Sequence, residues 1–355
     1  MKKITINMDD PDLSAIHEAV NILKKGGVIA LPTETVYGLG ADSRNKRAVE
    51  RLYDIKERPK DKPFTLCFAD RNKAQDVFAI MPPFAYRMIE NFWPGPLTIV
   101  SYGRDLEQKV GVRVPSNPVT ETVLRELNSP LFLSSANASG AKELFSVDEI
   151  ISTFGNKVDL VVDAGTSQFM KPSTVIDVTY HPFKVLREGV ISLNDLMRVF
   201  FHKRLVFVCT GNTCRSPMAE YILKSILSKK NPYILERYEI ISRGIMFIDG
   251  QPPSIDTLEV LSKKENINVS THRSRRIDRN TVLSSDLIVV MEQRHKDYLI
   301  KIEPTSEPRI FTLGKFLVPE FDKDIPDPIG KPYSKYEEVY SLIKNAVEEL
   351  TEWLS

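Results

Sequence analysis

One stretch near the middle of the chain constrains the fold most, because it joins a strand, a loop and a helix in one continuous run. The apolar residues 205–208 predict a buried strand, and the loop that follows contains Cys209 and Arg215. Apolar residues then recur at helical spacing, with Ser216 as the predicted N-cap and Pro217 at the first helical position. The strand and helix alternation after this stretch favours a doubly wound parallel sheet.

The loop in this stretch predicts an anion-binding site. Free amide groups at a helix N-terminus point at one place, and the helix dipole favours negative charge there. The same field stabilises a thiolate, so Cys209 is a candidate nucleophile, and the Arg215 guanidinium can hold two phosphoryl oxygens. A buried strand-end cysteine beside a solvated arginine fits the spacing alone equally well. The surrounding strand, glycine, asparagine and proline favour the catalytic interpretation.

The length of 355 residues predicts two domains, since one domain has about 150 residues. The pattern resets around residues 199–204, where a short charged joint occupies residues 202–204. We therefore expect one domain over residues 1–198 and a second over residues 204–355. The first has many short β-rich runs between few helices, which predicts an α/β fold with a mixed, twisted sheet.

Residues 205–355 resemble the low-molecular-weight protein phosphatase family in the loop 209–216 and in the runs 242–244, 270–275 and 285–292. The resemblance implies that Cys209 attacks phosphorus, that Arg215 stabilises the phosphoryl oxygens, and that Asp327, in an Asp-Pro pair, is the general acid. Asn212 and Ser216 would shape the loop and bond the thiolate. Cys214 would either trap an oxidised Cys209 as a disulfide or fill space. The phosphate-loop residues that the resemblance implies are Thr210, Gly211, Asn212, Thr213, Cys214 and Ser216.

Two positions bear on the phosphorylated residue that this family resemblance implies. Tyrosine-directed members usually have a bulky aliphatic residue where this chain has Thr213, and an aromatic residue where it has Ile329. The present loop is more similar to the branch that removes phosphate from protein arginine. Ile329 departs from both branches, and Tyr333 or Tyr336 is the candidate replacement for the aromatic wall. We expect phosphoarginine as substrate; a tyrosine phosphatase and a phosphoprotein-binding module without turnover are the alternatives.

Two stretches in the first half suit binding of a phosphorylated ligand. Residues 31–40 place threonines and glycines at a strand end, although a glycine-rich turn explains them equally well. Residues 56–63 carry several cations in a loop bounded by prolines, which suits a polyphosphate but also a solvated face.

With the motifs at 93–98, 112–115, 134–140, 171–177 and 186–189, these stretches resemble the YrdC family of threonylcarbamoyl-AMP synthases across about residues 10–190. The resemblance implies synthesis of threonylcarbamoyl-AMP and pyrophosphate from L-threonine, bicarbonate and ATP, toward a tRNA modification. Mg²⁺ would arrive with ATP, because no carboxylate cage is evident. The implied ATP-binding residues are Lys56, Arg58, Lys62, Asn137 and Arg187. The residues implied for threonine and bicarbonate are Thr33, Thr35, Arg113, Ser135 and Ser173.

Two departures from the synthase pattern affect these assignments. Cys67 stands where many synthases have a histidine near the threonine, and the run after Gly140 lacks the usual Ser-Pro-Thr. The form at 171–175 also occurs in a paralogous branch of unproved activity. The alternative for the first half is therefore an RNA- or nucleotide-binding module without turnover.

The composition fits a cytoplasmic enzyme. The N-terminus has acids where a signal peptide needs an apolar stretch, and no run of about 18 apolar residues could span a bilayer, so we expect no membrane partner. Three cysteines are too few for a disulfide framework. The net charge of +1 supplies no long-range attraction for nucleic acid. A contact with tRNA would therefore depend on a local basic patch, which the sequence does not reveal. The expected partners are the substrates, a phosphorylated protein and tRNA-modification proteins.

Overall fold

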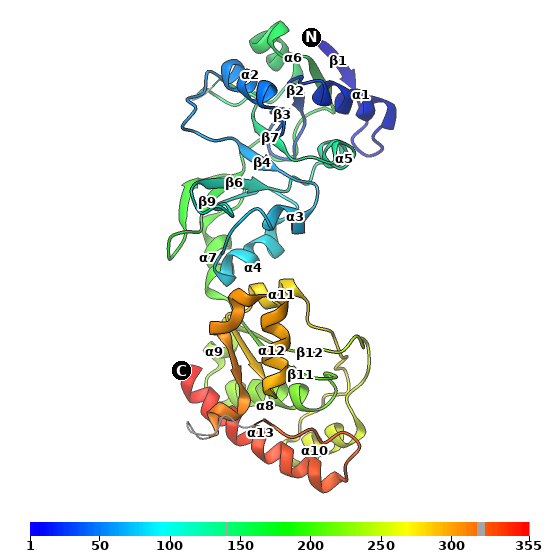
Figure 1. Ribbon diagram of the computed structural model, residues 1–355, viewed down its shortest axis with the longest axis vertical. Coiled ribbons are helices and arrows are strands. Elements are labelled where there is room, and N and C mark those ends of the chain that lie inside the picture. Colours follow the sequence, from blue (N-terminus) through cyan, green and yellow to red (C-terminus); the bar gives the residue numbers. More distant parts are fainter. Residues whose placement is uncertain (139–140, 318–323, 355) are drawn as a thin grey trace. The chain divides into compact units, whose positions relative to one another are not determined.

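The computed structural model describes residues 1–138, 141–317 and 324–354 (Figure 1). Contacts within the chain divide it into two compact units, Met1–Met197 and Arg198–Ser355. A single residue separates helix α7 (Leu193–Phe201) from strand β11 (Lys203–Cys209). The charged run at 202–204 is therefore mostly strand rather than a joint. No helix among the described residues is both long enough and apolar enough to cross a membrane.

Unit 1 is built on a ten-stranded mixed sheet in the order β1-β8-β2-β3-β7-β4-β6-β5-β9-β10. Strand β4 runs parallel to β6 and antiparallel to β7, which confirms the predicted mixed sheet. The strands are β1 Lys2–Thr5, β2 Ile29–Leu31, β3 Gly38–Asp42, β4 Thr65–Cys67, β5 Leu97–Tyr102, β6 Lys109–Arg113, β7 Leu131–Ser135, β8 Leu160–Asp163, β9 Thr174–Asp177 and β10 Lys184–Arg187. The helices before α7 are α1 Leu13–Lys24, α2 Lys46–Lys56, α3 Arg71–Gln75, α4 Pro83–Phe92, α5 Pro118–Leu127 and α6 Val147–Phe154.

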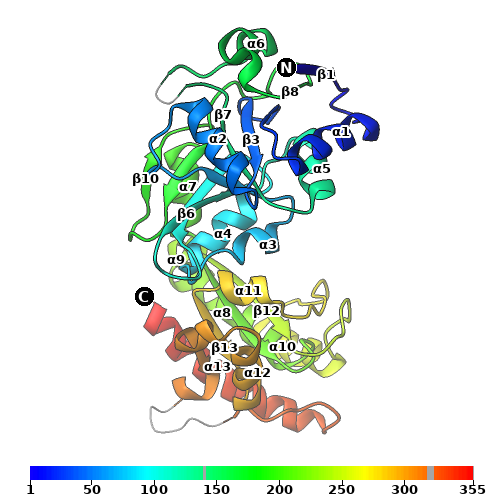
Figure 2. The same ribbon diagram turned by 45° about the horizontal axis from the view of Figure 1, so that its top comes forward.

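Two hydrophobic clusters cover the two faces of this sheet. Along β8, Leu160 and Val162 pack with helices α1 and α5, whereas Val161 packs with α2 and α6. This alternation follows from the two-residue period of a strand. Figure 2 shows α2 and α5 on different sides of the strands. One cavity of unit 1 lies further along the sheet, where β4, β5 and β6 present polar residues.

Strand β3 lies in the segment 31–40, for which a glycine-rich turn was one of the two interpretations of the sequence. It pairs antiparallel with β2 and β7 along residues that include Gly38 and Gly40. A Cβ atom on Gly38 would lie 2.8 Å from Cγ of Leu133 on β7, so the glycine permits a close approach of side chain to backbone. The glycine therefore marks tight packing in a strand, not a turn.

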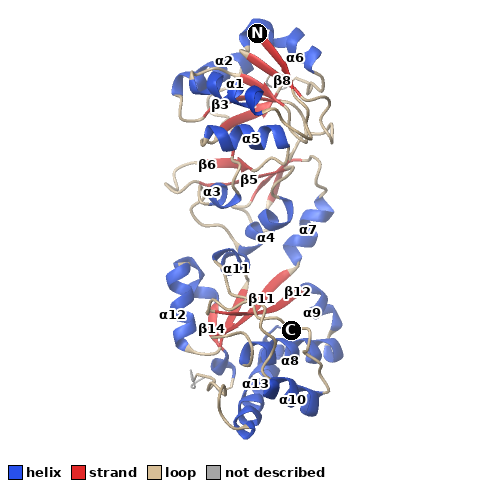
Figure 3. Ribbon diagram, turned by 90° about the vertical axis from the view of Figure 1, so that its right-hand side faces the viewer, coloured by secondary structure: helices blue, strands red, loops and turns tan. Residues whose placement is uncertain are grey.

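Unit 2 contains a four-stranded sheet in the order β12-β11-β13-β14, with every pair parallel. Its strands after β11 are β12 Tyr238–Gly244, β13 Leu287–Val290 and β14 Ile310–Thr312. Its helices are α8 Arg215–Lys230, α9 Pro232–Arg237, α10 Ile255–Glu265, α11 Arg279–Ser284, α12 Gln293–Ile302 and α13 Tyr333–Leu354. Figure 3 shows helices on both faces of these strands.

The packing along β11 explains the layers of unit 2. Leu205 and Phe207 belong to a core cluster with α8, α10 and α13, whereas Val206 and Val208 pack with α11 and α12. A strand with apolar residues on both sides must be covered on both faces, and this confirms the doubly wound parallel sheet. Because all four strands are parallel, their carboxyl ends lie at one edge, where the loop after β11 meets the start of α8.

Candidate active sites

The loop between β11 and α8 surrounds the sulfur of Cys209. The backbone N–H of Asn212 donates to Cys209 Sγ at 3.2 Å, and Ser216 Oγ lies 3.0 Å from the same sulfur. Cys209 is only 2 % exposed but lines a cavity of about 410 Å³ together with Arg215 and Asp327. The sulfur thus lies in the cavity with the Asn212 N–H directed at it.

Asn212 holds the bend of this loop. Its φ of 56° lies in the left-handed region, which asparagine adopts more readily than most residues. Its side-chain Nδ2 donates to Ser216 Oγ at 3.0 Å and to Ser242 Oγ at 2.8 Å, and its Oδ1 accepts from the Arg275 backbone N–H at 2.9 Å. The ring Nε2 of His272 lies 2.8 Å from the Asn212 carbonyl oxygen. Hydrogen bonds from neighbouring segments therefore fix the shape of the loop.

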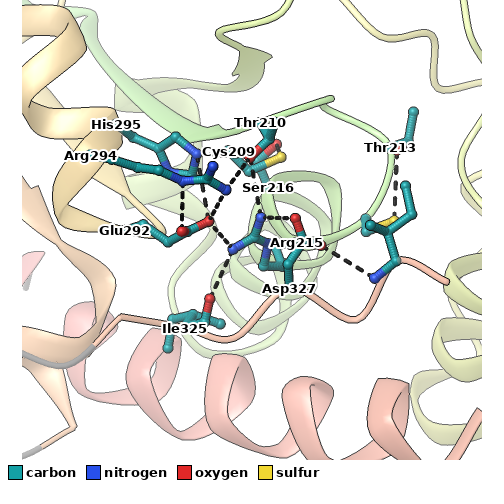
Figure 4. A network of polar contacts seen from close by, with 12 residues as sticks. Cys209, Thr210, Thr213, Arg215, Ser216, Glu292, Arg294, His295, Ile325 and Asp327 are labelled. Carbon is teal, nitrogen blue, oxygen red and sulfur yellow. Dashed lines mark hydrogen bonds and ion pairs between the residues drawn. The ribbon is translucent and has the colours of Figure 1, made fainter. Parts of the chain in front are cut away.

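Arg215 is buried behind the loop and bound by two carboxylates (Figure 4). Its Nη1 donates to Glu292 Oε1 at 2.6 Å and to the Ile325 carbonyl at 2.9 Å, while Nη2 donates to Asp327 Oδ2 at 2.5 Å. The guanidinium is 1 % exposed. The structure thus brings together Cys209, Arg215 and Asp327, although 118 positions separate Cys209 from Asp327 in the sequence.

Three residues beside Arg215 were missed by the sequence reasoning. Glu292 Oε2 accepts from Arg294 Nε at 2.7 Å; burial opposes the charge, but the Arg294 and Arg215 hydrogen bonds lower the pKa of Glu292. His295 is fully buried, with Nε2 3.0 Å from Thr210 Oγ1, and burial lowers its pKa to about 4. The only sequence signal was that the run 285–292 ends at Glu292; nothing linked it to Arg215.

Helix α8 begins two residues earlier than the sequence predicted. The N-cap is Cys214 rather than Ser216, and Pro217 is the third helical residue. The Ser216 hydroxyl lies near Cys209 and Asn212, and this contact replaces the capping bond that was expected. Cys214 is 4 % exposed and lines the same cavity as Cys209; its sulfur lies 3.3 Å from Ser254 Oγ.

The substrate wall of this cavity differs from the expected one. Neither Tyr333 nor Tyr336 lines it, so the prediction that a tyrosine replaces the aromatic wall is wrong: Tyr336 is 2 % exposed and packs in the core. Among the described residues, the lining contains no aromatic ring. The remaining lining residues are Thr210, Gly211, Thr213, Cys214, Met246, Ile248, Gln251, Pro252, Ser254 and Ile329.

Unit 1 has its own cavity, of about 430 Å³, on the polar part of its sheet. Strands β4, β5, β6, β7 and β9 contribute to its lining, as do the loops before β3 and β4. Eight of the ten residues predicted to bind ATP, threonine or bicarbonate line it: Thr33, Thr35, Arg58, Lys62, Arg113, Ser135, Ser173 and Arg187.

Two arginines of this cavity are fixed by neighbouring polar groups. Arg113 Nη2 donates to Glu34 Oε1 at 2.7 Å and to Thr35 Oγ1 at 3.0 Å. Arg187 donates from Nε to the Ser173 carbonyl at 2.9 Å and from Nη2 to Ser173 Oγ at 2.8 Å. Burial, and repulsion from Arg113, lower the pKa of Arg187. Cations that repel one another in a cavity are stabilised by an anionic ligand.

Lys56 and Asn137, the other two predicted ATP ligands, do not line the cavity. Lys56 is 1 % exposed; its Nζ donates to the carbonyl oxygens of Ser135 and Asn137 and, at 3.1 Å, to Asn137 Oδ1. Burial lowers the pKa of Lys56 to about 7. Ser135 Oγ donates to Asn137 Oδ1 at 2.6 Å. Lys56 therefore holds the loop that presents Ser135. Ser139 and Gly140 of this motif lie outside the described residues.

Among the further residues that line the cavity of unit 1 are Lys109, Gly111 and Cys67. Lys109 and Gly111 were not named from the sequence, and Cys67 was named only as a departure from the synthase pattern. Lys109 and Gly111 precede Arg113 by four and two positions, so they lie on the same face of β6. Strand periodicity was the signal that would have found Lys109. Cys67 also lines the cavity, and burial raises the pKa of its thiol to about 12. Cys67 is therefore a neutral thiol at physiological pH, not a nucleophile.

No metal centre is built from the side chains that the structure describes. Within residues 1–138, 141–317 and 324–354, no group of three or more histidine, cysteine, aspartate and glutamate residues is placed to hold a metal ion. Asp61 is the one carboxylate among the described residues that line the cavity of unit 1.

Comparison with known proteins assigns a family to each unit. A sequence model of the Sua5/YciO/YrdC family, described as "Telomere recombination", matches residues 21–189. A model described as "Low molecular weight phosphotyrosine protein phosphatase" matches residues 204–355.

Individual relatives agree with the first assignment. A putative threonylcarbamoyl-AMP synthase of Methanocaldococcus jannaschii is 36 % identical over 51 % of this chain and 90 % of its own. The structure of Escherichia coli YciO is 31 % identical over 55 % of this chain and all of its own, with a TM-score of 0.51. Sua5 of P. abyssi, solved in complex with L-threonine, shares the fold at 20 % identity, with a TM-score of 0.54 over 88 % of this chain and 99 % of its own.

The second unit aligns with solved phosphatases at lower TM-scores. An arginine phosphatase, YwlE from Geobacillus stearothermophilus, is 32 % identical over 43 % of this chain and 92 % of its own, with a TM-score of 0.38. The chain therefore belongs to the Sua5/YciO/YrdC family through its first unit and to the low-molecular-weight phosphotyrosine protein phosphatase family through its second, and it joins a synthase-type and a phosphatase-type enzyme in one polypeptide.

Proposed function

We propose that the chain is a bifunctional enzyme. Unit 1 condenses L-threonine, bicarbonate and ATP to threonylcarbamoyl-AMP and pyrophosphate, for the modification of tRNA. Unit 2 removes phosphate from protein phosphoarginine through a cysteinyl-phosphate. One observation supports both assignments: each unit has its own cavity in which basic side chains, several in unit 1 and Arg215 in unit 2, meet the polar groups that the respective chemistry requires.

In unit 1, the proposal gives the cations the role of binding anions. Arg58, Lys62 and Arg187 line one cavity, and together they can offset the charge of a triphosphate. Arg113, fixed by Glu34 and Thr35, is oriented to bind a carboxylate. The complex of P. abyssi Sua5 with L-threonine supports threonine as that ligand. Such a reaction depends mainly on positioning and charge neutralisation, because bicarbonate and a carbamate are weak nucleophiles.

Lys56 and Mg²⁺ take indirect roles in this proposal. Lys56 acts by holding the backbone of Ser135 and Asn137, since its ammonium group is already bonded to three oxygens. Asp61 is the one described carboxylate in the lining, so Mg²⁺ would be held mostly by the phosphates of ATP. The ion supplies charge neutralisation there. A lining with few carboxylates and several cations fits a metal that enters with the nucleotide.

In unit 2, Cys209 forms a bond to phosphorus while the phosphorus–nitrogen bond breaks, and Asp327 protonates the leaving guanidine nitrogen. Water then attacks the cysteinyl-phosphate, Asp327 accepts its proton, and phosphate leaves with the thiolate regenerated. Arg215 and the loop amides stabilise the phosphoryl oxygens in both steps. The positions of Cys209, Arg215 and Asp327 around one cavity support this sequence.

Two features support phosphoarginine over phosphotyrosine. The hydroxyl-bearing Thr213 lines the cavity, and a planar, polar guanidinium gains more from a hydroxyl and a carboxylate than a phenyl ring does. The described lining also lacks an aromatic ring, so a tyrosine ring would have no stacking partner. Phosphotyrosine is the second candidate, favoured by the family to which the unit belongs.

The phosphatase proposal is tested by comparing phosphoarginine and phosphotyrosine peptides of the same sequence. We expect a higher kcat/KM for phosphoarginine, and we expect Thr213→Ile to move the ratio toward phosphotyrosine by about tenfold. A wild-type preference for phosphotyrosine, unchanged in Thr213→Ile, would reject the arginine assignment. The matched control is Thr305→Ile, a threonine outside the cavity.

The synthase proposal is tested by pyrophosphate release. We expect release to require threonine, bicarbonate and Mg·ATP together, and to be lost in Arg58→Ala. The control is Arg104→Ala, an exposed arginine outside the cavity. ATP binding without release would instead favour a nucleotide- or RNA-binding module. We further propose that the enzyme works in the cytoplasm with tRNA-modification proteins, which a co-purification followed by the same assay would test.

A further inference from the structure

Exposed apolar side chains of unit 2 concentrate at the mouth of the phosphatase cavity. Among the described residues of this unit, nine large hydrophobic side chains are exposed. Five of them either line the cavity or directly adjoin a residue that does: Met246, Phe247, Ile248, Ile255 and Ile329. We call these five residues the apolar rim. Single exposed apolar residues are ordinary, but a cluster beside a binding site is not.

The segment that carries most of the rim is held in place by the phosphate loop. The Met246 N–H donates to the Thr210 carbonyl at 3.1 Å, and the Ser254 N–H donates to the Thr213 carbonyl at 3.1 Å. On its other side, the Ile248 carbonyl accepts from Ser274 Oγ at 3.0 Å. The apolar side chains are therefore presented by a fixed backbone. This segment loses little conformational entropy when a partner binds.

Phe247 is the most exposed member of the rim and is also oriented. Its side chain is 81 % exposed, yet the Arg276 guanidinium carbon lies 3.2 Å from the ring centroid. Arg276 Nη2 in turn donates to the Tyr298 hydroxyl at 3.0 Å. One face of the ring is occupied by this arginine, so the opposite face is available to a partner.

We propose that the apolar rim binds the residues that flank the phosphorylated residue of a protein substrate, and that these flanking residues are apolar. This inference rests on the phosphatase function of unit 2. The cavity connects Met246, Ile248 and Ile329 with Cys209. A phosphorylated side chain that reaches the sulfur therefore enters a cavity lined by these three residues, and the rim lies where the flanking residues of the substrate can contact it.

A polypeptide substrate explains the rim better than a small phosphate ester does. A small ester would be enclosed by the 410 Å³ cavity and would leave Phe247 and Ile255 without a role, because neither lines it. An acidic peptide would place carboxylates against a surface that is mainly hydrocarbon, at the cost of their hydration. Flanking leucine or valine residues instead bury apolar area on both sides.

The test uses the full-length enzyme and three synthetic peptides that carry the same phosphorylated residue flanked on both sides by leucine, by serine or by glutamate. We expect kcat/KM to be about tenfold higher for the leucine peptide than for the serine peptide, and lowest for the glutamate peptide. Phe247→Ser should reduce kcat/KM for the leucine peptide severalfold and leave the serine peptide unchanged. The matched control is Tyr233→Ser, because Tyr233 is 79 % exposed but lies outside the cavity and the rim.

Hydrolysis of p-nitrophenyl phosphate separates the inference from the function on which it rests. Suppose that wild type and Phe247→Ser both hydrolyse this ester, but that wild type hydrolyses all three peptides at equal rates. That result would overturn the proposed role of the rim and leave the phosphatase function intact. If wild type does not hydrolyse this ester, the result contradicts the phosphatase function instead. A dimer seen by sedimentation in wild type but not in Phe247→Ser would assign the rim to a second copy of the chain, and would also overturn the inference.

Discussion

Arg215 depends on Glu292 for its position, and this dependence can be measured. The buried guanidinium is bonded to Glu292 on one side and Asp327 on the other. If Asp327 moves during acid and base catalysis, Glu292 is the partner that keeps Arg215 fixed. Glu292 is a positioning residue in this account, because it touches Arg215 and not the described cavity.

We predict that Glu292→Gln lowers kcat for p-nitrophenyl phosphate about tenfold, with a smaller change in KM. Glutamine keeps an oxygen for the hydrogen bond but removes the charge. Glu292→Ala should be more severe, since it leaves a buried charge with one partner fewer. Glu352→Gln, on an exposed ion pair with Lys230, is the control. Equal kinetics for wild type and Glu292→Gln would show that Arg215 holds its position without this contact.

Lys56 should give the synthase a pH dependence. Three oxygens surround its Nζ, which matches the three N–H donors of the ammonium form, and burial lowers its pKa to about 7. As pH rises through about 7, Lys56 loses a proton and one donor. The loop that presents Ser135 should then loosen, so synthase kcat/KM should fall on the alkaline side.

We predict that Lys56→Met lowers the rate and removes this alkaline limb. The measurement is pyrophosphate release between about pH 6 and pH 9, at a fixed bicarbonate concentration. Lys60→Met, an exposed lysine of the same loop that lies outside the cavity, is the control. An alkaline limb that persists unchanged in Lys56→Met would assign the titration to another group.

At the scale of elements, strand β3 requires glycine. A Cβ on Gly38 would lie 2.8 Å from Leu133 Cγ, closer than packed carbon atoms allow. We predict that Gly38→Ala lowers the stability of unit 1 by about 1–3 kcal/mol, through overpacking. Calorimetry of the full chain, with hydrogen exchange to assign the transition to unit 1, measures this.

A second substitution checks that the cause is steric. Leu133→Ala removes the clashing atoms, so the double variant Gly38→Ala/Leu133→Ala should lose less than the sum of the two single variants. Gly111→Ala is the control, because its Cβ would meet Thr98 at an ordinary 3.6 Å. Strict additivity of the two changes would mean that the glycine is required for another reason.

Local sequence patterns predicted most elements correctly. The apolar run 205–208 lies in strand β11, and the many short β-rich runs of the first domain form its mixed sheet. The errors have local causes as well. A glycine-rich turn was one interpretation of residues 31–40, but Gly38 lies in β3, where it allows close packing on Leu133. Ser216 looked like an N-cap, but its hydroxyl is used near Cys209.

The sequence predicted the site residues that lie within short motifs. The loop at 209–215 and the residues of the synthase motifs were recognisable because each lies within a short segment. Glu292 and His295 were missed, because their role comes from contact with Arg215 and Thr210, about 80 positions away in the sequence. Lys56 was predicted to bind ATP. In the structure it is buried, and its Nζ donates to the carbonyl oxygens of Ser135 and Asn137.

At the scale of the whole molecule, the two sites are built independently. Every described residue that lines the synthase-type cavity lies within Met1–Met197, and every one that lines the phosphatase-type cavity lies within Arg198–Ser355. Each unit also has core clusters of its own. We therefore expect the two activities to be separable by substitution in the intact chain.

The most direct test measures both activities in one preparation of the full chain and its variants. Threonine- and bicarbonate-dependent pyrophosphate release reports on unit 1, and p-nitrophenyl phosphate hydrolysis reports on unit 2. We predict that Cys209→Ser abolishes hydrolysis and leaves pyrophosphate release unchanged, while Arg58→Ala does the reverse. Retained hydrolysis in Cys209→Ser, or retained pyrophosphate release in Arg58→Ala, would contradict the account of two separate active sites.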